Sequence, residues 1–299
     1  MNIAQLTTDF AIADQLAFVE GKGGVPCIQV SNSHADALIS IYAGQLLSYT
    51  PKGAADVLFV SDKAYYASGK AIKGGVPICW PWFGADPEGK GRPAHGFMRN
   101  RMWDVWATRG NADGSTTVIL GVESSPETLA IWPHAFKLAV EITVGNTLQL
   151  ALVTQNTGDA AFTLTQALHT YFSVGDIAQT TVTGLEGRQY IDKAAGAGDA
   201  IRPQAGAVTI AAEVDRVYLN VPAALAIQDG AQNRTIHITS SGNKTAVVWN
   251  PWAKIAAEMA DLQDDDYTRF VCVETTNAVD DVVEVPAGSE FRLVAEYAV

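Results

Sequence analysis

The sequence predicts an all-β protein, an antiparallel β-sandwich with a few short helices. Most apolar segments alternate between apolar and polar residues, which is the pattern of half-buried strands. Short turn signals such as Gly145-Asn146 separate these segments, and connections of this length join antiparallel neighbours. Because no alternation of strands with helices is present, a doubly wound parallel sheet is not expected.

The expected elements follow in chain order. The alternation predicts strands over Thr116–Val122, Lys137–Val144, Thr147–Thr154, Phe162–Phe172, Thr235–Thr239, Thr245–Trp249, Arg269–Thr275 and Phe291–Tyr297. Helical patterns are short, over Pro126–Trp132 and Lys254–Leu262. Residues 50–110 are rich in Gly, Pro and Trp, so we expect loops there, and loops on a rigid β scaffold are where sites are usually built.

Composition indicates a globular chain. Of its 299 residues 48% are hydrophobic and 17% charged, which supports a large core and excludes intrinsic disorder. The length alone would fit about two domains, but single all-β domains are often long. No linker or internal repeat is visible, so we expect one domain over residues 1–299.

The net charge of −12 argues against nucleic-acid and anionic-membrane partners, because binding phosphate backbones depends on basic side chains. The charge is uneven, however. Residues 63–109 carry a net charge of +5, from Lys63, Lys70, Lys73, Lys90, Arg92, Arg99, Arg101 and Arg109 against Asp86, Glu88 and Asp104. This basic block indicates a small anionic ligand, although a chance surface cluster would give the same count.

The compartment is predicted to be the cytoplasm. The segment beginning Met1-Asn2-Ile3 has neither the basic nor the apolar region of a signal peptide, and no stretch is long and apolar enough to cross a membrane. Cys27, Cys79 and Cys272 lie in apolar surroundings, so we interpret them as buried, reduced thiols. A monomer is compatible with the sequence.

His169 is the first candidate for acid–base chemistry. In the strand predicted over Phe162–Phe172, alternation places Phe162, Leu164 and Leu168 on one face. His169 falls on the other face with small and hydroxyl-bearing residues, which suits a cleft better than a core. A single strand histidine is nevertheless more often structural.

Two carboxylates are further candidates. Glu274 ends an apolar strand, where partial burial would raise its pKa toward the range of a general base. The alternative is a carboxylate at the sheet edge, facing water. Asp215 could bind a polyol or pair with Arg216, and the sequence favours the pairing.

The block Lys73–Gly84, followed by Arg92–Asn100, combines glycines, basic residues and aromatic rings. Glycines let the backbone approach a ligand, basic side chains donate to an anion, and aromatic rings offer flat faces to sugars. The alternative is a rigid structural loop whose tryptophans fill the core.

Together these motifs resemble the glucose-6-phosphate 1-epimerase (hexose-6-phosphate mutarotase) family, within the aldose 1-epimerase superfamily. The resemblance spans nearly the whole chain, over Lys73–Gly84, Pro93–Asn100, Trp132-Pro133-His134, Leu168–Phe172, Asp215–Tyr218, Asn250-Pro251-Trp252 and Val271–Glu274. It implies a galactose-mutarotase-like β-supersandwich that holds a sugar phosphate in a cleft on one sheet, with no cofactor and no metal.

The resemblance also implies roles for single residues. His169 matches the general acid toward the ring oxygen, and Glu274 matches the base on the anomeric hydroxyl. Among the substrate-binding positions, Asp215 matches one that binds sugar hydroxyls, His95 matches a cleft histidine and Arg99 matches a phosphate-binding arginine.

One position departs from the family pattern. The family usually has Arg-Gly-Gly where this chain has Lys73-Gly74-Gly75, and lysine keeps the charge but loses the bidentate fork. An aldose 1-epimerase for unphosphorylated sugars and a noncatalytic carbohydrate-binding protein are the alternative functions. Rates on phosphorylated and free sugars would separate the three.

Overall fold

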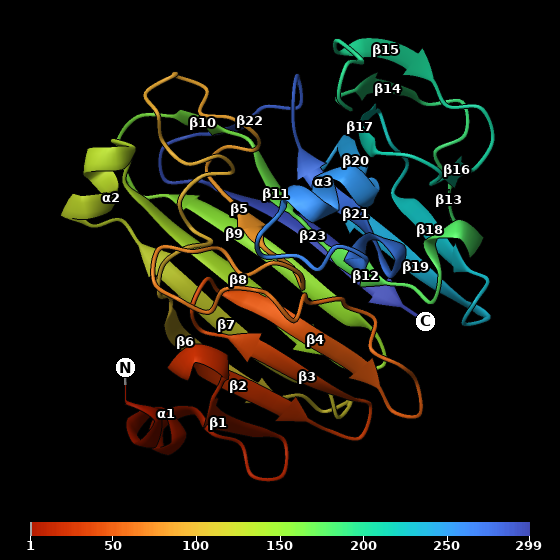
Figure 1. Cartoon of the computed structure of the whole chain (residues 1–299). Helices are drawn as coiled ribbons and strands as arrows, with labels where there is room; N and C mark the ends of the chain where they lie inside the picture. Colours follow the sequence, from red (N-terminus) through yellow and green to blue (C-terminus); the bar gives the residue numbers. More distant parts are fainter. Residues whose placement is uncertain (1) are drawn as a thin grey trace.

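The computed structural model describes residues 2–299, and it is built almost entirely from antiparallel sheets (Figure 1). The largest sheet has nine strands, in the order β16 (Val208–Thr209), β13 (Thr180–Thr183), β18 (Ala224–Asp229), β19 (Arg234–Ser241), β23 (Glu290–Ala298), β9 (Leu148–Asn156), β8 (Phe136–Val144), β7 (Thr116–Glu123) and β6 (Asp104–Gly110). The all-β prediction is confirmed.

The second large sheet has eight strands. Its order is β15 (Ala200–Pro203), β14 (Gln189–Asp192), β17 (Val214–Leu219), β20 (Thr245–Asn250), β21 (Phe270–Asn277), β11 (Gln166–Leu168) and β5 (Ile78–Cys79), and β12 (Tyr171–Ser173) also pairs with β21. A four-stranded sheet of β1 (Leu16–Glu20), β2 (Pro26–Ser31), β3 (Ala35–Ser40) and β4 (Gln45–Pro51) lies near the N-terminus, and β10 (Phe162–Leu164) pairs with β22 (Val283–Val285).

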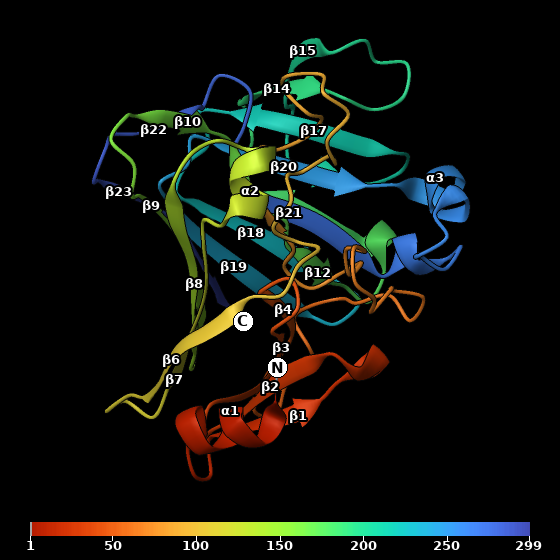
Figure 2. The ribbon, with the colours of Figure 1, turned by 90° about the vertical axis from the view of Figure 1, so that its left-hand side faces the viewer.

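The main core lies between the two large sheets. Strand β8 buries every second residue, including Leu138, Val140 and Ile142, and β21 contributes Val271 and Val273 to the same apolar cluster. In Figure 2, β8 and β9 stand on one side, β20 and β21 in the middle and α3 (Trp252–Glu258) beyond them. The eight-stranded sheet therefore has one face in the core and one face free to carry a site.

The helices are short: α1 (Ile3–Phe10), α2 (Pro126–Ile131) and α3. The helix predicted over Pro126–Trp132 is confirmed as α2, which Ser125 caps by accepting a hydrogen bond from the backbone N–H of Thr128. The helix predicted over Lys254–Leu262 is shifted, because α3 begins at Trp252 and ends at Glu258. Within residues 2–299 no helix has the length and apolarity needed to cross a membrane.

The single strand predicted over Phe162–Phe172 is wrong. The segment is divided into β10, which pairs with β22, and the separate strands β11 and β12, which both pair with β21. The break at His169 has a physical cause: its backbone N–H donates to Pro77 O at 3.0 Å, and the N–H of Thr170 donates back to Leu168 O at 3.0 Å. The alternation nevertheless survives the break, with Leu168 and Phe172 in the core and His169 on the opposite side.

Candidate active site

A cavity of about 570 Å³ lies on the outer face of the eight-stranded sheet, and all six sequence-predicted site residues line it. Strand β17 supplies Asp215, β21 supplies Glu274, and His169 follows β11. The loop-rich region between β4 and β6 supplies the other three, Lys73, His95 and Arg99. Residues separated by up to 201 positions in the sequence thus meet around one space.

His169 and Glu274 are in direct contact at the floor of this cavity. Nε2 of His169 lies 3.4 Å from Oε1 of Glu274, whose side chain is only 2% exposed. The imidazole is fixed by its neighbours: it stacks on Tyr171 at 5.0 Å and an interplanar angle of 9°, and it meets Trp249 edge-on at 6.1 Å. Glu274 is buried within a central strand, so the alternative of a carboxylate at the sheet edge is wrong.

Burial shifts the pKa values of His169 and Glu274 in opposite directions. It lowers the pKa of His169 well below its usual value, and the nearby His95, Arg99 and Lys73 lower it further. It raises the pKa of Glu274 well above its usual value, with Asp215 adding to the effect. Neither Nδ1 of His169 nor Oε2 of Glu274 has a hydrogen-bond partner within residues 2–299. Two buried titratable groups in contact, with shifted pKa values and a place in the lining of a cavity, make this pair the candidate for acid–base chemistry.

Lys73 and Arg99 form a basic wall of the same cavity. Nζ of Lys73 lies 3.5 Å from Oδ1 of Asp261 and 3.9 Å from Sδ of Met259. The guanidinium of Arg99 donates to Ala94 O at 3.1 Å, and no ion pair within residues 2–299 joins it to a carboxylate. A cation without a protein carboxylate is available to an anionic ligand.

Two glycines next to Lys73 and His95 allow the backbone of this region to pack closely against neighbouring backbone. A side chain at Gly74, which has φ +116°, would place its Cβ 2.4 Å from Phe59 O. A Cβ at Gly96 would lie 1.8 Å from Trp80 O, so only glycine fits beside His95. Nδ1 of His95 lies 3.3 Å from the backbone N of Gly84, which donates to it. Burial, with the nearby cations, lowers the pKa of His95 to about 3, so this ring is neutral at physiological pH.

Asp215 faces the cavity without an ion-pair partner within residues 2–299. The favoured pairing with Arg216 is wrong, because neighbouring residues of β17 point to opposite faces. Arg216 instead donates to Gln204 Oε1 at 3.2 Å and lies over the ring of Tyr190. Burial raises the pKa of Asp215 to about 6, with Glu213 contributing.

Sequence reasoning missed four residues of the site region. Tyr171 and Trp249 line the cavity around His169, and Tyr171 had a signal, since it falls on the same strand face. Lys193 also lines the cavity, paired with Asp199 at 2.6 Å, but it lies in a turn rich in Gly and Ala without any pattern. Asp261 was missed because only the folded chain brings it to Lys73.

The three cysteines are free and buried, as predicted. Burial raises the pKa of the Cys27 thiol to about 11 and that of Cys79 to about 12, and it raises that of Cys272 as well. None is therefore suited to nucleophilic catalysis. Over residues 2–299, no group of three or more His, Cys, Asp and Glu side chains is arranged to hold a metal ion.

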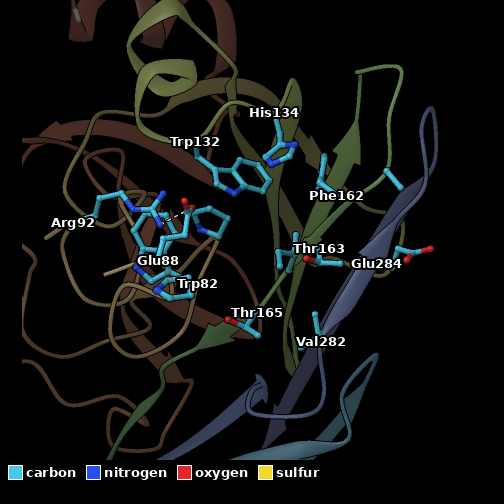
Figure 3. Close-up of a pocket in the computed structure, with 14 residues that line it drawn as sticks. Trp82, Glu88, Arg92, Trp132, His134, Phe162, Thr163, Thr165, Val282 and Glu284 are labelled. Carbon is cyan, nitrogen blue, oxygen red and sulfur yellow. Dashed lines mark hydrogen bonds and ion pairs between the residues drawn. The ribbon is translucent and has the colours of Figure 1, made fainter. Parts of the chain in front are cut away.

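A second cavity, of about 540 Å³, is lined in part by the chain just before His95, through Trp82 and Arg92 (Figure 3). Trp82, Arg92, Trp132 and His134 line it together with Thr163 and Glu284. Its arginine is engaged in structure: Arg92 forms ion pairs with Asp86 and Glu88, donates to Ile131 O at 3.1 Å and lies over the ring of Trp82.

Comparisons with known proteins agree with this geometry. The sequence profile described as aldose 1-epimerase matches residues 26–298. The chain belongs to the aldose 1-epimerase family. It is therefore an isomerase of the mutarotase type, built on a galactose-mutarotase-like fold.

Individual relatives are similar over most of their length. An Escherichia coli (strain K12) protein named "Putative glucose-6-phosphate 1-epimerase" is 40% identical over 84% of this chain and 83% of its own. A Cenchrus ciliaris protein of the same name is 37% identical over 86% and 79%. The crystal structure of "a putative mutarotase (YeaD)" from Salmonella typhimurium superimposes with a TM-score of 0.86 and 34% identity, covering 99% of each chain.

Proposed function

We propose that this enzyme interconverts the α and β anomers of a hexose 6-phosphate, with D-glucose 6-phosphate as the first candidate. The observation that carries the proposal is the contact of a buried acid–base pair, His169 and Glu274, in a cavity that Lys73 and Arg99 also line. The names of the relatives support the choice of substrate.

The geometry of the pair suits the bonds that must change. Mutarotation takes a proton from the anomeric oxygen O1 and gives one to the ring oxygen O5, and both oxygens are bonded to the same carbon, C1. The acid and the base must therefore stand beside each other, as His169 and Glu274 do at 3.4 Å.

Each step then balances within the pair. Glu274 accepts the proton of O1 while His169 donates one to O5, the C1–O5 bond breaks and C1=O1 forms. The open aldehyde rotates about C1–C2. The O5 hydroxyl attacks the other face of C1 and returns its proton to His169, while Glu274 returns its proton to O1. Enzyme and proton count are restored, and no electron is transferred, so the cycle requires no redox cofactor.

The other lining residues have positioning roles in this proposal. Asp215 accepts hydrogen bonds from sugar hydroxyls. The neutral His95, which lines the same cavity, contacts the sugar ring. Lys73 and Arg99 contact the phosphate. We also take residues 1–299 as a single functional unit, because one apolar cluster extends from Leu6 to Tyr297.

Exchange NMR between anomers tests the proposal, with glucose 6-phosphate, galactose 6-phosphate and glucose compared at equal concentration. We expect acceleration well above the enzyme-free rate, with the phosphosugars preferred. Equal acceleration of glucose would favour an aldose 1-epimerase for free sugars. Binding without acceleration would favour a carbohydrate-binding protein.

A further inference from the structure

The basic wall faces the imidazole that must carry a proton. The groups that face His169 are His95, at a ring distance of 5.9 Å, Tyr171, Glu274 and the two cations Lys73 and Arg99. Lys193 and Asp215 line the same cavity farther along the sheet.

Lys73 lines a recess together with Tyr171, and Tyr171 stacks on the His169 ring at 5.0 Å, so the charge of Lys73 lies on the imidazole side of the pair. This position disfavours a protonated imidazole, and Lys73 lowers the pKa of His169, whereas Arg99 lowers the pKa of both His169 and Glu274.

The charge of Lys73 is only partly neutralised within the protein. Its one ion-pair partner within residues 2–299, Asp261, lies at 3.5 Å, and both side chains are about one-fifth exposed, at 18% and 23%. A smaller recess of about 240 Å³ adjoins the cavity here and is lined by Lys70, Lys73 and Arg99 with Asp261 as its carboxylate. Three cations against one carboxylate leave a net positive recess beside the catalytic pair.

We propose that the phosphate of the substrate activates the enzyme as well as anchoring it, because neutralising Lys73 lets His169 hold the proton that opens the sugar ring. In the free enzyme the pair shares one proton, which burial keeps on Glu274. When a phosphate dianion binds at Lys73 and Arg99, the O–H bond at Glu274 breaks and an N–H bond forms at His169. This inference rests on the proposed function, and it adds a second role for the phosphate.

An anion supplied separately should then activate a sugar that lacks one. We expect phosphite dianion to accelerate the exchange of free glucose by about tenfold, which corresponds to about one unit in the pKa of the acid. The acceleration should saturate with phosphite after the enzyme-free rate is subtracted, and it should disappear in the Lys73→Gln variant. Phosphite that inhibits glucose 6-phosphate exchange competitively but leaves glucose exchange unchanged would overturn the inference.

Substitutions of Lys73 and of its partner Asp261 provide a second test, which does not require phosphite to bind. Lys73→Gln removes the opposing charge and should raise the free-glucose rate about 3- to 10-fold while lowering the glucose 6-phosphate rate. Its alkaline limb with glucose should move to higher pH. Asp261→Asn leaves Lys73 unneutralised, so it should lower the free-glucose rate. A role in phosphate binding alone would leave the free-glucose rate unchanged in both variants, and that result contradicts the inference.

The matched control is Lys137→Gln, which removes one positive charge from the exposed side of β8, where Lys137 pairs with Glu123. Its rates on both sugars should equal those of the wild type. Circular dichroism confirms that each variant is folded. If the wild type accelerates neither sugar, the proposed function fails. If it accelerates glucose 6-phosphate while phosphite and the charge variants have no effect on glucose, only the activating role of the phosphate fails.

Discussion

The two cavities beside the loop Trp80–Arg99 are nearly equal in size, at about 570 and 540 Å³, but their charged groups are arranged in opposite ways. In the cavity of Figure 3 the one cation, Arg92, is engaged by Asp86 and Glu88, and its guanidinium covers Trp82. In the cavity around His169, the side chains of His169 and Glu274 are buried and each has a polar atom without a hydrogen-bond partner within residues 2–299.

This difference shows that volume does not identify the active site here. Arg92 holds the pKa of Asp86 well below its usual range, so that pair is charged and stable across physiological pH. In the cleft the shifts run the other way, since burial works against the charged forms of Glu274 and His169. We therefore propose that the cavity around His169 carries the proton transfers and that the ion pairs of Arg92 have a structural role.

Removing either member of the proposed catalytic pair should have the largest effect. We expect Glu274→Gln and His169→Ala each to lower the mutarotation rate by roughly 10²-fold or more, which is the usual contribution of a positioned acid or base. Initial rates of anomer exchange give the measurement. Glu274→Gln should unfold at about the same temperature as the wild type, because the amide has nearly the size of the protonated carboxyl group that it replaces. A folded variant at the wild-type rate would remove that residue from the mechanism.

Arg99→Ala should act selectively on phosphorylated substrate. The loss of a charge-assisted contact costs about 1–3 kcal/mol, or about 5- to 150-fold in kcat/KM for glucose 6-phosphate. The rate on free glucose should change little. Arg109→Ala, which removes an exposed arginine of the same basic block, is the control. Equal losses on both sugars would show that Arg99 does not contact the phosphate.

Arg92→Ala tests the structural role proposed for the second cavity. Since Arg92 joins Asp86, Glu88 and Ile131 and covers Trp82, its loss should lower the melting temperature by on the order of a few degrees. The kcat on glucose 6-phosphate should remain within about twofold. Thermal unfolding and rate measurements on one preparation test both statements. A large fall in kcat without a change in stability would make the second cavity part of the catalytic machinery.

Asp215→Asn should give the smallest effect. Asp215 has a pKa raised to about 6 by burial, so between the unfolded value of 3.8 and about 6 the folded protein binds this proton more tightly than the unfolded chain. Its contribution therefore makes the free energy of unfolding fall as pH rises through this window, by about 1 kcal/mol after allowing for solvent screening. In Asp215→Asn this contribution to the pH dependence of the free energy of unfolding should be absent. Denaturant unfolding at pH 4 and pH 6.5 measures it, and the same slope in both proteins would contradict the assignment.

Much of the fold could be predicted from the C-terminal two-thirds of the sequence. Strands such as β7, β8 and β9 alternate cleanly because one face is in the core, and their predicted bounds lie within two residues of the observed ones. The sheet of β1–β4 and helix α1 were not predicted. The division of Phe162–Phe172 could not be read from its pattern either, because it depends on the backbone bond from His169 to Pro77, a tertiary contact.

For the site, the residue types and motifs were sufficient to name the six lining residues, because each stands in a recognisable block. Their electrostatic partners were not predictable. Asp261 pairs with Lys73, which lies 188 positions earlier in the sequence. Asp215 and Arg216 do not pair, because Asp215 points to the face of β17 that lines the cavity and Arg216 points to the other face. Contacts between loops, unlike alternation along one strand, leave no periodic signal.

We propose that the neighbouring His169 and Glu274 catalyse anomer exchange of a phosphosugar. Exchange NMR on glucose 6-phosphate, with the wild type and Glu274→Gln at equal concentration, is the decisive experiment for this proposal. We expect rapid exchange between the α and β signals with the wild type and a roughly 10²-fold slower rate with the folded variant. Exchange at the enzyme-free rate with the wild type, or equal rates for the two proteins, would contradict it.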